Sequence, residues 1–326
     1  MASSREILTD TAHSTISTAR EFAAMLLPFT NKERGAARIN ASLRSFAKPG
    51  TWFAPMWAVM VGVVASPHSH WDIGTIGRVV ALAIMAGPLL CAFSQVVNDH
   101  FDRDVDSINE PLRPTVSSML DGRTIALVAL AVATLALAIA FALGRTIGYL
   151  ALAGMVLALA YSVPPLRLKA RNGWIANGAC ALSYEGFAWL AGTAAFGGLT
   201  RGGIILAIVY SFGAHGLMTL NDFKSLKGDR ALGLRSLPVM LGEKKALLQA
   251  QTFINLSQAL AMAFVLSHGN WIAASIMNLL LVVQLPMQAR LSRDPARFAP
   301  WYCASGIPPF CWSMLVAAIA LRSGGF

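Results

Sequence analysis

Long apolar stretches constrain this chain more than any other feature of its sequence. A helix needs about 20 mostly apolar residues to cross the hydrocarbon core of a bilayer. Hydrophobic residues make up 56% of the 326 positions and charged residues only 13%, against about 25% charged in a typical soluble domain. We count nine candidate spans, at 51–66, 79–98, 124–143, 146–163, 174–196, 203–220, 246–267, 270–289 and 302–321. The sequence therefore predicts an all-α, polytopic membrane protein, in which a cytoplasmic segment (1–50) precedes a domain of nine transmembrane helices (51–326).

The distribution of basic residues supports nine spans with the N-terminus in the cytoplasm. Under that topology, 22 of the 26 Lys and Arg residues fall on the cytoplasmic side. The four that remain outside are Arg78, Arg145, Arg201 and Arg322. This asymmetry follows the positive-inside rule, and dropping one span would exchange the two sides for every later loop. The net charge of +10 is therefore explained by topology, and we expect a lipid bilayer, not a nucleic acid, as partner.

Two predicted cytoplasmic loops, 99–123 and 221–245, hold nine of the 16 carboxylates of the chain. An internal repeat underlies them, because an Asn-Asp pair marks the end of the span before each loop and an Asp follows eight residues after that Asn. The matched residues are Asn98, Asp99 and Asp106 in the first loop and Asn221, Asp222 and Asp229 in the second. Spans 2–4 and 6–8 are therefore predicted to be two related units that close on one central cavity.

The spacing of these acids indicates a metal site. If the spans continue as helices past the membrane edge, residues four apart lie on one face. Asn98, Asp102 and Asp106 then form an oxygen-rich stripe with Asp99 beside it. The second loop supplies another pair of carboxylates, Asp222 and Asp229.

Carboxylates this close repel one another unless a cation neutralises them. Oxygen ligands suit Mg²⁺ or Mn²⁺, and Mg²⁺ is usually held by one or two carboxylates together with substrate phosphates. We therefore predict a metal-bridged diphosphate at the cytoplasmic mouth of the cavity. Basic side chains near that mouth would bind the same diphosphate: Arg113, Arg167, Lys169, Lys224 and Arg230. The alternative is that the acids form a solvated loop face that balances local Lys and Arg.

A few polar side chains are candidates for contact with a second, acceptor substrate. Glu185 lies in the fifth predicted span beside Tyr184, and a carboxyl at that depth costs about 2.5–3.5 kcal/mol. It should therefore face either a structural partner or a substrate. His215, in the sixth span, could ligate a metal or bond across helices. Tyr161 ends the fourth span, where tyrosine is also common as an interface anchor.

Four segments of the sequence carry a family resemblance. They are NDHFDRDVDSINEPLRP at 98–114, YSVPPLRLKARNGW at 161–174, LSYEGFAWLAG at 182–192 and NDFKSLKGDRALGLRSLPVMLG at 221–242. With the predicted spans, they resemble the UbiA superfamily of intramembrane prenyltransferases, and within it the chlorophyll and bacteriochlorophyll synthases. The similarity extends over about residues 40–320.

The resemblance implies Mg²⁺-dependent transfer of a C20 prenyl group, geranylgeranyl or phytyl, from its diphosphate to the propionate carboxylate of a chlorophyllide or bacteriochlorophyllide. Asn98, Asp102 and Asp106 match the family's first acidic motif, and Asp222 and Asp229 match the second. Asp102, Asp106 and Asp229 are the predicted catalytic residues. Arg167 and Lys169 match a basic pair that is expected to hold phosphate.

Two residues depart from the family pattern, because Asp104 replaces a usual His and Lys227 replaces a usual Glu. The resemblance also implies a bacterial inner membrane or intracytoplasmic photosynthetic membrane, with pigment-assembly proteins as possible partners. Three alternatives remain at this point. They are prenylation of a quinone or haem precursor, a multi-pass transporter with a polar pathway, and an inactive pigment-binding subunit.

Overall fold

A computed structural model describes residues 49–68, 72–109 and 122–324, and these residues form helices and connecting turns without a β-strand. The helices of the first half are α3 (Pro49–Ala65), α4 (Ile73–Ile84), η1 (Met85–Cys91), α5 (Ala92–Phe101), α6 (Arg103–Asn109), α7 (Gly122–Leu143) and α8 (Arg145–Ser162). The next helices are α9 (Leu168–Arg171), α10 (Gly173–Ala181), η2 (Leu182–Phe187), α11 (Ala188–Ala194), α12 (Arg201–Asp222), α13 (Leu226–Ala231) and α14 (Leu237–Leu241). The chain ends with α15 (Glu243–Ser267), α16 (Trp271–Leu291), α17 (Pro295–Ser305) and α18 (Ile307–Gly324).

The all-α, membrane-spanning architecture predicted from the sequence is confirmed. Within the described residues, seven helical segments are long and apolar enough to cross a membrane. They are Ile73–Phe101, Gly122–Leu143, Arg145–Ser162, Arg201–Asp222, Glu243–Ser267, Trp271–Leu291 and Pro295–Gly324. The count of nine is not confirmed, because the first expected span is the 17-residue helix α3 and the fifth is the succession of α10, η2 and α11.

Small residues bring α3 and α11 into backbone contact. A Cβ added at Gly62 would lie 2.1 Å from the carbonyl oxygen of Trp189, and one at Gly192 would lie 2.2 Å from that of Val59. Helices in lipid associate through such close van der Waals packing, since no hydrophobic effect drives them together there. The glycine pair therefore fixes α3, which lines the cavity described below, against the fifth expected span.

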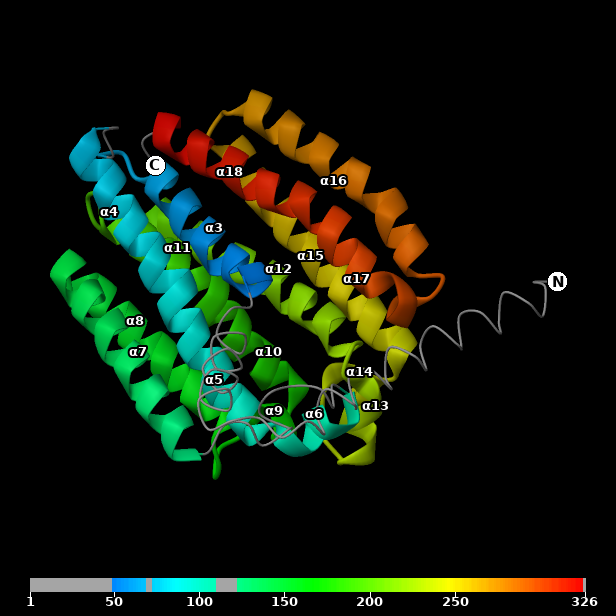
Figure 1. Cartoon of the computed structure of the whole chain (residues 1–326). Coiled ribbons are helices and arrows are strands. Elements are labelled where there is room, and N and C mark those ends of the chain that lie inside the picture. The colour runs from blue at the N-terminus through cyan, green and yellow to red at the C-terminus, as the bar shows by residue number, and fades with distance from the viewer. Residues whose placement is uncertain (1–48, 69–71, 110–121, 325–326) are drawn as a thin grey trace, which may run out of the picture. The chain divides into compact units, whose positions relative to one another are not determined.

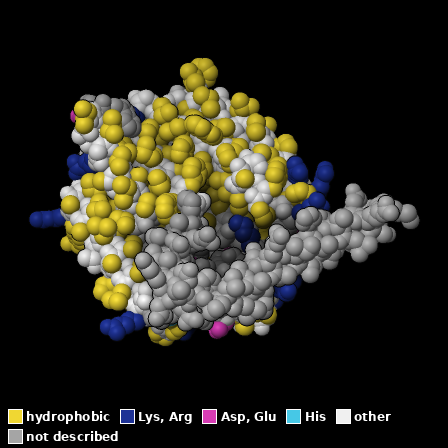
Figure 2. All heavy atoms as spheres, in the orientation of Figure 1, with side chains coloured by type: hydrophobic (Ala, Val, Ile, Leu, Met, Phe, Trp, Pro, Cys, Tyr) yellow, Lys and Arg dark blue, Asp and Glu magenta, His cyan; other side chains and the backbone are white. Residues whose placement is uncertain are grey.

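Aromatic side chains fill the centre of the bundle next to α12. Trp189 stacks on Tyr210 with ring centroids 5.7 Å apart, and Tyr210 meets Phe310 edge-on at 5.4 Å. All three are at most 1% exposed. The outer faces of the long helices carry exposed apolar side chains instead, such as Leu130 and Leu279, and such side chains cover much of the surface in view (Figure 2). This is the pattern of a bundle that faces lipid.

The short helices α6, α9, α13 and α14 lie together at one end of the long helices (Figure 1). They follow the ends of α5, α8 and α12, so both acidic segments of the sequence reach the same end. In the first segment, the helical hydrogen bonds continue although Asp102, between α5 and α6, has an irregular backbone conformation. The Asp102 N–H donates to the Asn98 carbonyl at 2.9 Å, and the Asp106 N–H donates to the Asp102 carbonyl at 2.8 Å. The helical hydrogen bonds of the second segment do not continue in this way, because residues 223–225 form a turn between α12 and α13.

Candidate functional site

A cavity of about 1000 Å³ opens among α3, η1, α5, α8, α10, η2, α12 and α18, and we call it the central cavity. Its two ends differ in chemistry: the acidic segments lie at one, and mostly apolar side chains line the rest. Ten of the predicted site residues line it: Asn98, Asp102, Asp106, Tyr161, Lys169, Tyr184, Glu185, Asp222, Lys224 and Asp229. The fold brings these residues together from seven helical segments, α5, α6, α8, α9, η2, α12 and α13, and from the residues that join them.

Asp102 is the charged centre of the first acidic segment. It is 5% exposed and forms an ion pair with Lys169, while the Arg167 guanidinium lies 3.5 Å from its Oδ1. Lys169 Nζ also donates to Asn98 Oδ1 at 3.2 Å. Among the described residues, none donates a hydrogen bond to the buried Oδ1 atom of Asp102. It therefore remains able to bind a cation or another donor.

The basic residues reach Asp102 because the chain turns sharply between α8 and α9. Arg167 has a left-handed backbone with φ of 34°, which is uncommon for a residue with a side chain. Its guanidinium donates to the Phe101 carbonyl at 2.8 Å, so the turn is tied to the end of α5. Strained backbone of this kind is found at functional sites where surrounding contacts hold it in place.

The second acidic segment supplies two carboxylates from separate helices. Asp222, at the end of α12, accepts a hydrogen bond from Asn177 Nδ2 at 3.0 Å. Asp229, on α13, is 5% exposed and accepts one from Ser225 Oγ at 3.3 Å. Asn177 was not predicted from the sequence, since it lies inside an apolar span with no acidic motif around it.

Burial shifts the pKa values of two charged groups at this end of the cavity. Burial lowers the pKa of Lys169 to about 8, although Asp229, Asp99 and Asp222 act in the opposite direction. Burial also raises the pKa of Asp229, against hydrogen bonds from Ser236 and Ser225 and the charge of Lys169. Both shifts are caused mainly by burial, which disfavours the charged form of each group. A divalent ion would reverse the shift at Asp229, since an adjacent positive charge stabilises the ionised carboxylate.

Asn109 joins the two acidic segments, and the sequence reasoning missed it. Its Oδ1 accepts from the Gly228 N–H at 3.0 Å, and its Nδ2 donates to the Ser225 carbonyl at 3.3 Å. A Cβ at Gly228 would lie only 2.5 Å from Asn109 Nδ2, so only glycine leaves room for this contact. A signal was available, because Asn109 follows Asp106 by three residues and shares its helix face.

Other predicted residues lie away from the cavity wall. Arg230 is exposed and pairs with Glu243 at 3.1 Å. His215 bonds to the Trp174 carbonyl at 3.1 Å and to Gln249 at 3.3 Å, which supports the structural alternative for this histidine. Asp99 is 1% exposed but does not line the cavity.

Arg167 reaches Asp102 without lining the cavity itself. Arg113 lies outside the described residues. The two departures from the family pattern, Asp104 and Lys227, are exposed and do not line the cavity.

The donor set fits a metal held jointly with a substrate. In the part of the chain that the structure describes, no three His, Cys, Asp or Glu side chains form a ready-made metal cage. Two carboxylate segments line one wall, however, and the buried Asp102 Oδ1 has no hydrogen-bond partner. Mg²⁺ usually takes one or two carboxylates and completes its shell with phosphates and water. The residues present match that requirement.

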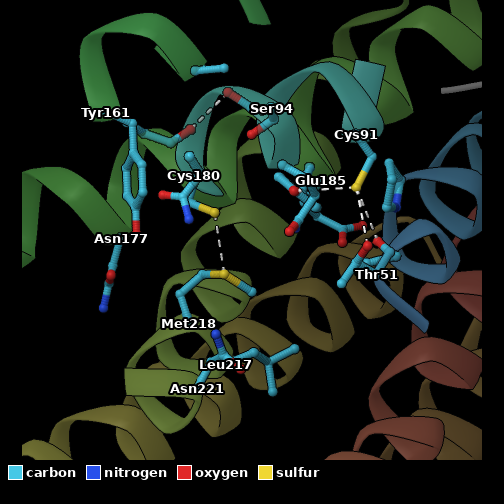
Figure 3. A pocket seen from close by; sticks show the side chains of 18 of the residues that line it. Thr51, Cys91, Ser94, Tyr161, Asn177, Cys180, Glu185, Leu217, Met218 and Asn221 are labelled. Carbon is cyan, nitrogen blue, oxygen red and sulfur yellow. Dashed lines mark hydrogen bonds between the residues drawn. The ribbon is translucent and has the colours of Figure 1, made fainter. Parts of the chain in front are cut away.

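Glu185 lies on the deeper wall, in η2. In the view of Figure 3 it lies on the same side of the pocket as Cys91, and Asn177 and Tyr161 lie on the other side. It is 5% exposed, and its Oε1 has no hydrogen-bond partner.

Comparison with known proteins gives the same family that the sequence motifs indicate. The UbiA prenyltransferase family matches residues 55–315. The chain is 44% identical over 276 residues to the bacteriochlorophyll synthase 34 kDa chain of Chloroflexus aurantiacus, covering 85% of this chain and 88% of that one. It is 42% identical over 289 residues to the bacteriochlorophyll synthase 33 kDa chain of Cereibacter sphaeroides, covering 86% and 93%.

Among solved structures, a UbiA homolog from Archaeoglobus fulgidus bound to GPP and Mg²⁺ superposes with a TM-score of 0.70. The match covers 87% of this chain and 99% of that one at 19% identity. At that identity the similarity establishes a shared fold.

Proposed function

The chain belongs to the UbiA prenyltransferase family, and from this premise we propose that it esterifies a chlorophyllide or bacteriochlorophyllide with a C20 isoprenoid. The donor is geranylgeranyl or phytyl diphosphate, and the acceptor group is the propionate carboxylate of the macrocycle. The observation that carries the proposal is the central cavity, where two buried acidic segments lie at one end of a largely apolar chamber. Relatives named bacteriochlorophyll synthase, at 42–44% identity over most of the chain, support this choice of acceptor.

Asn98, Asp102 and Asp106 would hold one side of the metal–diphosphate group, and Asp222 and Asp229 the other. Asp99 is buried behind the cavity wall and would help to hold Asn98, Asp102 and Asp106 in place. The metal, Mg²⁺ or alternatively Mn²⁺, supplies Lewis-acid stabilisation of the charge that grows on the leaving diphosphate. A solved family member with bound GPP and Mg²⁺ supports a divalent ion in this role.

Basic side chains stabilise the same leaving group. Lys169 and Lys224 line the cavity, and Arg167 lies beside Asp102. Their charges act where negative charge develops as the allylic carbon–oxygen bond breaks. Arg113 belongs to this proposal from its sequence position alone, and the Glu243 ion pair draws Arg230 away from such a role.

The new bond forms between the allylic carbon and an oxygen of the propionate, while the diphosphate departs with the electron pair of the broken bond. An ordinary carboxyl has a pKa of about 4, so the nucleophile is ionised at neutral pH and needs no general base. The apolar walls of the cavity exclude water that would otherwise capture the electron-poor carbon.

The site would face the cytoplasm of a bacterial inner or intracytoplasmic photosynthetic membrane. The charge asymmetry of the sequence supports this orientation, since the acidic segments lie on the side with most of the Lys and Arg. A pigment-assembly partner, the domain boundary at residue 50 and the internal repeat of spans 2–4 and 6–8 remain predictions. Family membership argues against the transporter alternative.

An assay in isolated membranes tests this function. Membranes that contain the protein are incubated with bacteriochlorophyllide or chlorophyllide, geranylgeranyl diphosphate and Mg²⁺, and the pigments are separated by chromatography. We expect an esterified pigment that is absent from control membranes. Prenylation of a quinone or haem precursor, with no pigment ester, would contradict the proposal.

A further inference from the structure

Glu185 is a buried carboxyl of the central cavity that the diphosphate chemistry does not use. Its side chain lines the cavity and is 5% exposed, and its Oε1 has no hydrogen-bond partner in the part of the chain that the structure describes. A buried polar atom without a partner costs about 1–3 kcal/mol. Proteins tolerate this free-energy cost at sites where a bound ligand supplies the missing hydrogen-bond partner.

The position of Glu185 along its helix separates it from the diphosphate end. Asn177, which bonds to Asp222, lies eight residues earlier on the same helical succession. Eight residues advance a helix by about 12 Å. Glu185 is therefore too deep to bind the diphosphate together with Asp222.

The wall around Glu185 is built from two π-helical segments, η1 and η2. Cys91 ends η1, and its Sγ lies 3.3 Å from the Tyr184 hydroxyl of η2 and 3.5 Å from Thr51 Oγ1 of α3. π-Helical turns occur frequently at functional sites, where they redirect side chains that a regular helix would place elsewhere. Thr51, Cys91 and Tyr184 thus form a polar patch on the cavity wall, and Glu185 follows Tyr184 directly in η2 and lines the same cavity.

The neighbouring wall, formed by α8, has different chemistry. The cavity-lining residues of α8 that precede Tyr161 are apolar: Leu150, Ala151, Gly154, Met155, Leu157 and Ala158. An isoprenoid tail is wholly hydrocarbon, so it has no polar group that would lack a hydrogen-bond partner against such a wall. It would leave the Glu185 carboxyl without a partner, whereas a tetrapyrrole carries oxygen-bearing substituents that can bond to it.

We propose that Glu185 binds the acceptor macrocycle through a hydrogen bond to a polar ring substituent, while the prenyl tail lies along α8. This inference rests on the proposed function, since it identifies which substrate occupies each wall. The propionate then points toward the acidic end and the ring extends inward to the polar patch. Glu185 acts in this account as a binding residue for the acceptor and makes no contact with the donor.

Substrate-specific kinetics test the assignment. Glu185→Leu removes the hydrogen-bonding group at similar volume, and we expect the KM for the pigment to rise about tenfold, the effect of one lost hydrogen bond. The KM for geranylgeranyl diphosphate should stay at the wild-type value. Glu185→Gln keeps hydrogen-bonding atoms and should restore most of the pigment affinity. An unchanged pigment KM in Glu185→Leu, or an equal rise in both KM values, would overturn the inference.

A matched control comes from Gln258 of α15. It is 1% exposed, neither amide atom has a partner, and it does not line the cavity. Gln258→Leu should leave both KM values unchanged. A selective rise in its pigment KM like that of Glu185→Leu would count against a specific contact at Glu185.

A further variant does not depend on Glu185→Leu folding. Glu185→Asp keeps the carboxyl but withdraws it by one methylene, so a severalfold rise in pigment KM is expected, and no rise would contradict the contact. Wild-type protein that forms no pigment ester would refute the proposed function itself. Active wild type with unaffected Glu185 variants refutes only this inference.

Discussion

Lys169 of α9 forms an ion pair with Asp102, the residue at which α5 gives way to α6. The same ammonium donates to Asn98, so one lysine from a different helix holds two members of the first acidic motif. In the free protein Lys169 offsets part of the acidic charge, and in our proposal it faces the diphosphate once the substrate is bound. This exchange of partners makes Lys169 the basic residue on which the account depends most.

Replacing Lys169 by Ala should lower kcat/KM for the prenyl diphosphate about 100-fold, the effect of losing one charge-stabilising donor. Lys169→Arg keeps the charge and should retain a substantial part of the activity. Steady-state kinetics at varied diphosphate concentration measures both variants. Equal activity of Lys169→Ala and wild type would remove this residue from the site.

Replacing Asp102 or Asp229 by Ala should abolish most pigment esterification, by about 100-fold or more, because each removes a ligand of the metal–diphosphate group. Asp104→Ala is the matched control, since Asp104 belongs to the same acidic segment but is exposed and does not line the cavity. It should esterify at nearly the wild-type rate. Product chromatography compares the three variants, and full activity in both Asp102→Ala and Asp229→Ala would contradict the ligand assignment.

Asn109→Ala should uncouple the two acidic segments, since both hydrogen bonds of the amide to the second segment are lost. Each such bond contributes about 1 kcal/mol, and each 1 kcal/mol lowers Tm by about 2–4 °C in a chain of 150–250 residues, so losing both bonds should lower Tm by several degrees. Thermal unfolding in detergent measures this change. A Tm equal to that of wild type, with unaltered activity, would show that the bridge has no role.

Gly62→Val should prevent α3 and α11 from packing. The added side chain would meet the Trp189 backbone, where even a Cβ comes within 2.1 Å of the carbonyl oxygen. Backbone atoms cannot move aside as the end of a flexible side chain can, so the clash should prevent the two helices from packing. The variant should therefore accumulate poorly in membranes. Gly50→Val, at a glycine whose added Cβ meets no atom within 4 Å, is the control and should accumulate normally. Similar levels of both proteins would contradict the close packing.

The sequence predicted the apolar helices and the first acidic motif well, because both depend on local periodicity. Asn98, Asp102 and Asp106 keep their shared face since the helical hydrogen bonds continue through Asp102. The sequence could not show that residues 223–225 turn the chain, so Asp222 and Asp229 come from different helices. Local spacing carries no information about such a turn.

Long-range contacts account for the other differences. Arg230 was expected at the diphosphate, but Glu243, 13 residues later, pairs with it on the surface. Asn177 reaches Asp222 across 45 residues of sequence, and no local pattern indicates that meeting. Residues that line a cavity from several helices are set by tertiary packing, which hydrophobic periodicity does not encode.

Metal dependence of product formation is the most direct test of the central claim. Purified protein is treated with a chelator and then given bacteriochlorophyllide, geranylgeranyl diphosphate and either Mg²⁺, Mn²⁺ or no metal, while pigment ester and released diphosphate are both measured. The account predicts ester and diphosphate in equal amounts with added metal, and neither product without it. Ester formation that persists without metal, or diphosphate release with no ester, would contradict it.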